Sequence, residues 1–123
     1  MTGADGTCRL TLHVLDVSAG RPAAGMAVAL VLHAPGDATD TPVPTELVTT
    51  DLITDVDGRA GGDGVPLLAP GTHELRYAVG GYFGSTPTFY DVVPVRFVVR
   101  ADDTHVHVAV LVSPWSYTTY RGS

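Results

Sequence analysis

Residues 9–16, with the sequence RLTLHVLD, alternate between aliphatic and other side chains and predict a β-strand. Because side chains alternate across a strand, Leu10, Leu12 and Val14 lie on one face. The other face carries Thr11, His13 and Leu15. We therefore expect this strand to bury its aliphatic face and to present a histidine on the opposite side of a sheet.

The rest of the chain repeats this pattern, with short runs rich in Val, Thr, Leu and Tyr between turns. The turns are supplied by 14 Gly and 9 Pro, which is typical of an all-β domain. Further strands are predicted over residues 25–33, 45–53, 72–79, 93–100, 104–112 and 115–121, with a weak one within 60–70. Turns are predicted at 20–22, 55–58 and 102–103, a loop at 34–44, and one helical turn within 80–87.

About eight strands with at most one short helix predict an all-β fold, a two-sheet antiparallel β-sandwich. The 123 residues suit a single domain over residues 1–123, with residues 1–7 as a flexible N-terminus. Two sheets of this size leave edge strands exposed, and oligomerisation is one way to cover them.

The composition excludes several classes of function. The single cysteine, Cys8, excludes an internal disulfide framework and a multi-cysteine zinc site. The net charge of -6 argues against nucleic-acid binding. The longest apolar run, residues 23–32, is shorter than the roughly 20 residues that a membrane-spanning helix needs. We expect a soluble cytoplasmic protein that binds no nucleic acid and no membrane.

Three histidines are candidates for chemistry. His13 is either a hydrogen-bonded core or interface histidine or a general base, since imidazole titrates near neutral pH. His105 and His107 are two residues apart, so both imidazoles share one face of their strand. They could bind a metal with His13, or act in acid–base catalysis without metal. Alternatively, His105 caps the strand near solvent while His107 packs inside.

Two further features are ambiguous when taken alone. Arg59 follows the predicted Asp57–Gly58 turn, where an arginine is usually solvated. The last residues, from Ser116 to Ser123, are aromatic and extended instead of a frayed polar tail. An ordered final strand would hold Arg121 in a fixed place, where its forked donors could meet a planar anion or an imide-like ligand.

Three segments together resemble a known family. Residues 12–16 followed by 20–25 (LHVLD, GRPAAG) resemble the opening motif of the transthyretin-related family, and residues 54–59 (TDVDGR) resemble its central motif. The segment His105–Val106–His107–Val108, with the later Ser-Pro and Ser-Tyr pairs, resembles the C-terminal signature. The closing YRGS, residues 120–123, resembles the mark of the 5-hydroxyisourate hydrolases. Ala109 stands where the family usually has Pro, and Val106 stands where it often has Tyr.

The resemblance implies a transthyretin-like sandwich that assembles as a homotetramer, a dimer of dimers, with active sites at a subunit interface. It implies hydrolytic opening of the six-membered ring of 5-hydroxyisourate, a product of urate oxidation, with no metal and no organic cofactor. The implied catalytic residues are His13, Arg59, His107 and Ser123. The implied substrate-binding residues are His13, Arg59, Tyr120, Arg121 and Gly122.

The residues themselves are suited to this reaction. Ring opening needs an activated water, a proton for the leaving nitrogen and stabilisation of an oxyanion. A His13/His107 pair can supply the first two, and Arg59 can oppose the developing negative charge. Two alternatives stay open at this point: a ligand carrier on the same fold, and a metalloenzyme that uses His13, His105 and His107.

Overall fold

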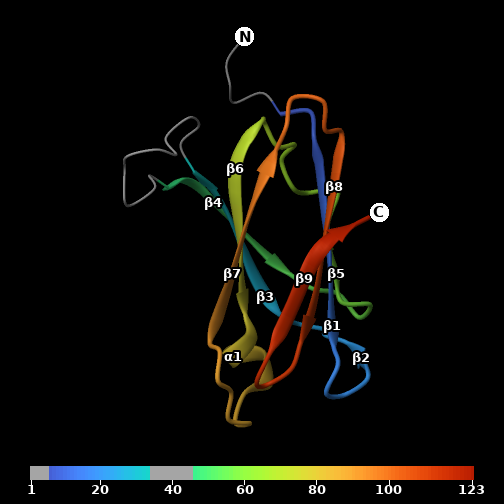
Figure 1. Cartoon of the computed structure of the whole chain (residues 1–123), viewed down its shortest axis with the longest axis vertical. Helices are drawn as coiled ribbons and strands as arrows, with labels where there is room; N and C mark the ends of the chain where they lie inside the picture. The colour runs from blue at the N-terminus through green and yellow to red at the C-terminus, as the bar shows by residue number, and fades with distance from the viewer. Residues whose placement is uncertain (1–5, 34–45) are drawn as a thin grey trace.

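The computed structural model describes residues 6–33 and 46–123, and it consists of two packed β-sheets (Figure 1). The first sheet contains β1 (Arg9–Asp16), β2 (Arg21–Pro22), β5 (Arg59–Gly61), β8 (His105–Val112) and β9 (Tyr117–Gly122). The second contains β3 (Ala27–His33), β4 (Glu46–Ile53), β6 (Gly71–Ala78) and β7 (Val92–Val99). The short helix α1 (Val79–Phe83) follows β6 directly.

The order of strands in the first sheet is β2-β1-β8-β9, and β5 also pairs with β1. The order in the second sheet is β4-β3-β6-β7. β1 and β8 run parallel, in a register from Arg9 opposite His105 to Asp16 opposite Val112. This register brings the two histidine-bearing strands side by side, with Thr11 directly opposite His107.

The core lies between the two sheets and is built almost entirely from aliphatic side chains. The β1 residues Leu10, Leu12 and Val14 are buried as the alternation predicts. β8 contributes Val106, Val108, Val110 and Val112 to the same core. The second sheet contributes Leu75 and Tyr77, both fully buried. Thr11, His13 and His107 therefore lie on the outer face of the first sheet, away from the core.

The predicted fold class is confirmed, with differences in detail. The described residues form nine strands, because Arg21–Pro22 pairs briefly with the end of β1 where a turn was predicted. The β1–β8 pair is parallel, which alternation within a strand cannot reveal. The weak strand within 60–70 reduces to β5 and an isolated bridge between Cys8 and Leu68.

The remaining differences concern segment ends. The helix occupies Val79–Phe83 and ends at Gly84, whose φ of 63° favours glycine. The predicted loop at 34–44 lies outside the described residues, as do residues 1–5 of the predicted flexible N-terminus. Within that N-terminus, the Thr7 N–H donates to the Leu68 carbonyl at 3.2 Å. Among the described residues, no helix is long and apolar enough to cross a membrane.

Candidate active site

Arg59 reaches the outer face of the first sheet because β5 pairs with β1. Arg59 lies directly opposite His13 in this antiparallel pair, so both side chains belong to one face of the sheet. The turn before β5 brings the chain back to β1: Gly58 has a φ of 75°, and its carbonyl accepts the Val14 N–H at 2.8 Å. A Cβ at Gly58 would collide with the Val14 carbonyl. Glycine is therefore required there on two counts.

The carboxylate of Asp55 holds this turn together. Its Oδ1 accepts the N–H of Asp57 at 2.9 Å and that of Arg59 at 3.0 Å. The Arg59 N–H, followed by the Asp57 N–H, lowers the pKa of the Asp55 carboxyl below its ordinary value. Asp55 is thus ionised at neutral pH and fixes the backbone from which the Arg59 side chain extends.

His13 is oriented by the same turn. Its Nε2 lies 2.9 Å from the carbonyl oxygen of Asp57. A carbonyl only accepts hydrogen bonds, so Nε2 carries a proton and donates it. In neutral His13 the lone pair is consequently on Nδ1.

His107 lies on β8, which pairs with β1 along the edge opposite β5, and a residue of β1 fixes its ring. Its Nδ1 lies 2.7 Å from the hydroxyl oxygen of Thr11, and the Nε2 of His105 lies 2.7 Å from the same oxygen. Burial lowers the pKa of His107, the nearby Arg59 guanidinium lowers it further, and His105 and His13 add to this when they are protonated. His107 is therefore neutral at pH 7, as a general base must be.

The chain end completes the site. Gly122 lies directly opposite His107 across β8 and β9, and the His107 ring occupies the space where a Cβ at Gly122 would be. Ser123 follows β9 and lines the same open groove as Arg59 and His107. The groove has a volume of about 510 Å³, and its other lining residues are Arg9, Thr11, Leu12, Asp55, Ala60, Gly61 and His105.

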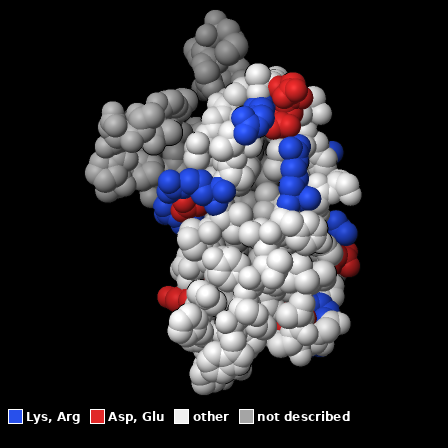
Figure 2. Space-filling model, viewed as in Figure 1, with Lys and Arg blue, Asp and Glu red and all other residues white. Residues whose placement is uncertain are grey.

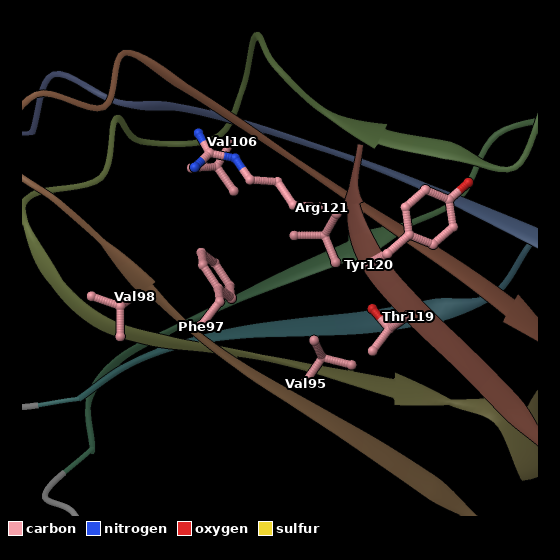
Figure 3. A pocket seen from close by; sticks show the side chains of 8 residues that line it. Val95, Phe97, Val98, Val106, Thr119, Tyr120 and Arg121 are labelled. Atoms are coloured by element: carbon pink, nitrogen blue, oxygen red, sulfur yellow. The ribbon is translucent and has the colours of Figure 1, made fainter. Parts of the chain in front are cut away.

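Tyr120 and Arg121 leave β9 on opposite sides, as Figure 3 shows. Tyr120 pairs with Ala109, which places it on the face that carries His107 and Gly122. Arg121 extends over the other face, where its guanidinium donates to the Asp103 carboxylate and the His105 carbonyl, both at 3.2 Å. The structure therefore brings together His13, Arg59, His107, Gly122 and Ser123, whereas the Arg121 side chain lies apart from them.

Arg121 instead borders a mostly apolar pocket of about 200 Å³ between β7 and the pair β8–β9 (Figure 3). Val95 and Phe97 line it from one sheet, and Val106 and Val108 line it from the other. Its polar lining consists of Thr119, Tyr120 and Arg121, with no His, Asp or Glu, and it lies across the first sheet from His107. It is therefore not a candidate for the hydrolytic site.

The described residues do not assemble the three-histidine metal site considered from sequence. Within residues 6–33 and 46–123, no group of three His, Cys, Asp or Glu side chains could hold one metal ion. His105 Nε2 and His107 Nδ1 both meet the Thr11 hydroxyl, and the two ring centroids are 6.4 Å apart.

Residues 10–122 match the model of the HIUase/transthyretin family. The chain belongs to this family. It is 44% identical over 124 residues to the 5-hydroxyisourate hydrolase of Deinococcus radiodurans, and the match covers 93% of this chain and 95% of that protein.

Solved structures of related proteins have the same fold. The structure of Klebsiella pneumoniae 5-hydroxyisourate hydrolase superposes with a TM-score of 0.71 at 30% identity, covering 94% of this chain and 99% of that one. A crystal structure of (S)-allantoin synthase superposes with a TM-score of 0.76 at 35% identity, covering 98% of this chain. This chain spans only 45% of the allantoin synthase chain, so the domain recurs as one part of a longer protein.

Three residues that line this groove were not singled out from the sequence: Arg9, Thr11 and Asp55. Arg9 and Thr11 share the outer face of β1 with His13, so alternation within residues 9–16 was a usable signal. The hydrogen bonds of Thr11 with His105 and His107 depend on the β1–β8 register, which no local pattern contains. The role of Asp55 was visible as the first residue of a turn that ends at Arg59.

Proposed function

We propose that the chain hydrolyses 5-hydroxyisourate, opening its six-membered ring to 2-oxo-4-hydroxy-4-carboxy-5-ureidoimidazoline in urate degradation. The observation that best supports this proposal is that Arg59, His107 and Ser123 line one groove. His13, opposite Arg59, completes a pair of imidazoles around this arginine. Relatives over nearly the whole chain carry the name of this hydrolase.

The two histidines divide the acid–base work. The proton of His13 is on Nε2 and bonded to the Asp57 carbonyl, so His13 presents Nδ1. The Nδ1 of His107 is bonded to Thr11, so His107 presents Nε2. One imidazole removes a proton from water as its oxygen attacks the ring carbonyl. The leaving ring nitrogen receives a proton from the pair as the amide C–N bond breaks.

Arg59 stabilises the charge that develops in this step. A guanidinium remains cationic at any working pH and can donate two parallel hydrogen bonds to a planar anionic edge. Aimed at the former carbonyl oxygen, it acts as a preorganised oxyanion donor. Gly122 lets His107 pack against β9, while Tyr120 and Ser123 contribute to binding and positioning the ring. Arg121, whose side chain points to the other face, contributes through its backbone in β9. The proposed reaction uses no metal and no organic cofactor.

The proposal includes a homotetramer, a dimer of dimers, with each site at a subunit interface. β7 and β9 are edge strands of the two sheets and lie side by side in Figure 1, where a second copy could extend both sheets. A second surface is apolar: Phe89 is 72% and Trp115 66% exposed, and Tyr90 packs its ring against both Phe89 and Tyr117. The lower part of the face in Figure 2 carries few charges, as a contact surface would.

The proposed location is the cytoplasm. The chain's single cysteine, Cys8, is buried and free, which suits a reducing compartment.

An ultraviolet assay tests the activity. Urate oxidase generates 5-hydroxyisourate in the cuvette, and its decay is followed with and without the protein, in the presence of a chelator. We expect fast, chelator-resistant decay that is lost in His107→Asn and retained in Thr118→Ala, an exposed β9 change outside the groove. Decay at the spontaneous rate from folded wild-type protein would contradict hydrolysis and leave a ligand carrier. Loss of activity with chelator, restored by zinc or copper, would favour the metalloenzyme.

Sedimentation of the same preparation tests the assembly. We expect one species of four chains that dissociates when Val98, an exposed residue of β7, is changed to Asp. A monomer with full activity would contradict the proposed interface site.

A further inference from the structure

The hydroxyl of Thr11 joins His105 and His107 into one hydrogen-bonded chain. Its Oγ1 lies 2.7 Å from the Nε2 of His105 and 2.7 Å from the Nδ1 of His107. Parallel pairing of β1 with β8 places Thr11 directly opposite His107, and the two-residue spacing brings His105 to the same face. His105 is exposed, whereas His107 and Thr11 are partly buried.

The single proton of this hydroxyl couples the two imidazoles. A threonine hydroxyl donates one hydrogen bond and accepts others. It can therefore donate to His105 or to His107, but not to both. When both histidines are neutral, the one that does not receive the proton must donate its own N–H to Oγ1. While the hydroxyl proton points to one of the two rings, the tautomers of His105 and His107 are linked: one of the two bonded nitrogens carries a proton and the other does not.

Two arrangements satisfy this link. In the first, His107 Nδ1–H donates to Thr11, and Thr11 donates to His105 Nε2, which leaves the lone pair of His107 on Nε2. In the second, both hydrogen bonds reverse and Nε2 of His107 carries the proton. No described residue hydrogen-bonds Nε2 of His107, so this nitrogen is the one available to a water in the groove. Only the first arrangement gives that water a base.

We propose that Thr11 and His105 are positioning residues that keep the proton of neutral His107 on Nδ1. The inference rests on the proposed hydrolytic function, because that function requires a lone pair facing the groove. Nε2 of His107 then takes a proton from water as the water oxygen bonds to the ring carbonyl carbon. The imidazolium keeps its Nδ1–H bond to Thr11. It returns the Nε2 proton to the leaving nitrogen as the C–N bond breaks, so Thr11 and His105 end unchanged.

The coupling matters because His107 is neutral at working pH, so its single ring proton can be on either nitrogen. Burial lowers the pKa of His107, the Arg59 guanidinium lowers it further, and a proton on His105 or His13 would add to this effect. A neutral imidazole has two tautomers, and which one forms is decided by the partner of the other nitrogen. With His13 already fixed by the Asp57 carbonyl, Thr11 supplies the corresponding restraint for His107.

The ¹⁵N chemical shifts of the His107 ring test the proposal without substrate. In the ¹⁵N-labelled full chain, we expect a protonated Nδ1 and an unprotonated Nε2 at a pH where His107 is neutral. Thr11→Val keeps the shape but removes the hydroxyl, and it should shift the tautomer toward Nε2–H. Thr11→Ser should retain the wild-type shifts. A wild-type His107 with its proton on Nε2 would overturn the proposal.

Kinetics on the same proteins provide the second readout. We expect Thr11→Val to lower kcat at least about tenfold, with little change in KM. The loss should not exceed the roughly 10²–10⁴-fold that a general base supplies. Thr11→Ser should recover most of kcat, and Thr118→Val, a matched change on exposed β9, should keep it. Equal impairment in the Ser and Val variants would assign Thr11 a packing role and contradict the inference.

His105 provides an independent test if Thr11→Val fails to fold. His105→Ala removes the acceptor of the Thr11 proton at an exposed position, and it should mix the two tautomers of His107. Unchanged His107 shifts in this variant would contradict the coupling. Wild-type protein that does not accelerate hydroxyisourate decay would refute the proposed function instead, and the tautomer measurement would still stand by itself.

Discussion

The imidazole of His107 lies over the α-carbon of Gly122, its direct partner across β8 and β9. A Cβ at Gly122 would collide with Cδ2 of this ring and stand 3.5 Å from its Nε2. The ring cannot retreat freely, because its Nδ1 is bonded to Thr11 on the other side. The glycine of the closing YRGS therefore leaves the space that the His107 ring of the neighbouring strand occupies.

Gly122→Ala should displace His107 and lower kcat at least about tenfold, which corresponds to roughly 1.4 kcal/mol of transition-state stabilisation. The fold should survive, because the φ of Gly122 is not in the left-handed region. Gly81→Ala on α1 is the matched control, since a Cβ there meets only Ala78 at 3.9 Å. Steady-state kinetics and thermal melting measure both variants, and a fully active Gly122→Ala would contradict the close packing.

The pH profile of kcat/KM should report a depressed pKa of His107. Burial, then Arg59, His105 and His13, lower this pKa below 6.5, so the base form persists at pH 7 and is lost only on further acidification. Arg59→Gln removes one positive charge, so the pKa of His107 should rise and the acid limb should move to higher pH. The same variant should lose about 10²-fold in kcat as an oxyanion donor.

NMR titration of the His107 ring checks the direction of these shifts. Arg21→Gln, at an exposed position on β2, is the matched control and should leave the profile unchanged. A wild-type His107 that titrates above 6.5, or an acid limb that Arg59→Gln moves to lower pH, would contradict the electrostatic account.

Local patterns predicted the elements of this fold better than their pairing. The strand at residues 9–16 is found with its predicted ends, because aliphatic and other side chains alternate from Arg9 to Val14 and a turn follows Asp16. The pairing of Thr11 with histidines 94 and 96 residues away depends on a parallel register that no segment encodes by itself. The brief pairing of Arg21–Pro22 with β1 was missed because glycine and proline there indicate a turn.

The candidate site divides in the same way. His13, Arg59 and His107 could be singled out by residue type and by resemblance, but the outer face they share exists only after β5 and β8 pair with opposite edges of β1. Arg121 illustrates the limit of motif transfer. It lies inside the closing motif, yet alternation along β9 turns its side chain away from His107 and toward Asp103.

Tyr82→Phe should destabilise the fold without affecting the site. The Tyr82 hydroxyl donates to the buried Asp16 carboxylate at 2.9 Å and ties the segment of α1 to the end of β1. Burial raises the pKa of Asp16, but hydrogen bonds from Ser18, Tyr82 and Ala19 outweigh burial and hold the pKa below its ordinary value. Losing one such bond should cost about 1 kcal/mol in the free energy of unfolding at pH 7.

This cost should shrink on acidification. A carboxyl with a depressed folded-state pKa stabilises the fold above its unfolded pKa, about 3.9, and the contribution is lost as the pH falls through the folded value. Urea unfolding at fixed protein concentration at pH 7 and pH 3 measures the difference. Tyr90→Phe is the control, since no described residue hydrogen-bonds the Tyr90 hydroxyl. An equal loss in both variants would show that the Asp16 bond is not the cause.

Ser123 allows the role of the chain end to be separated from its strand. Deleting residues 120–123 would also remove the ladder partners of His107, Val108 and Ala109, so lost activity could reflect a damaged β9. Ser123 follows the last strand residue, and its side chain is exposed in the groove.

Ser123→Ala should therefore lower kcat/KM about tenfold or more, as expected when one hydrogen bond to a charged group is lost. The melting temperature should not change. Ser85→Ala, an exposed position after α1, is the matched control and should keep both activity and stability. Full activity in Ser123→Ala together with an inactive Ser123 deletion would assign the contribution to the backbone of Ser123 instead of its hydroxyl.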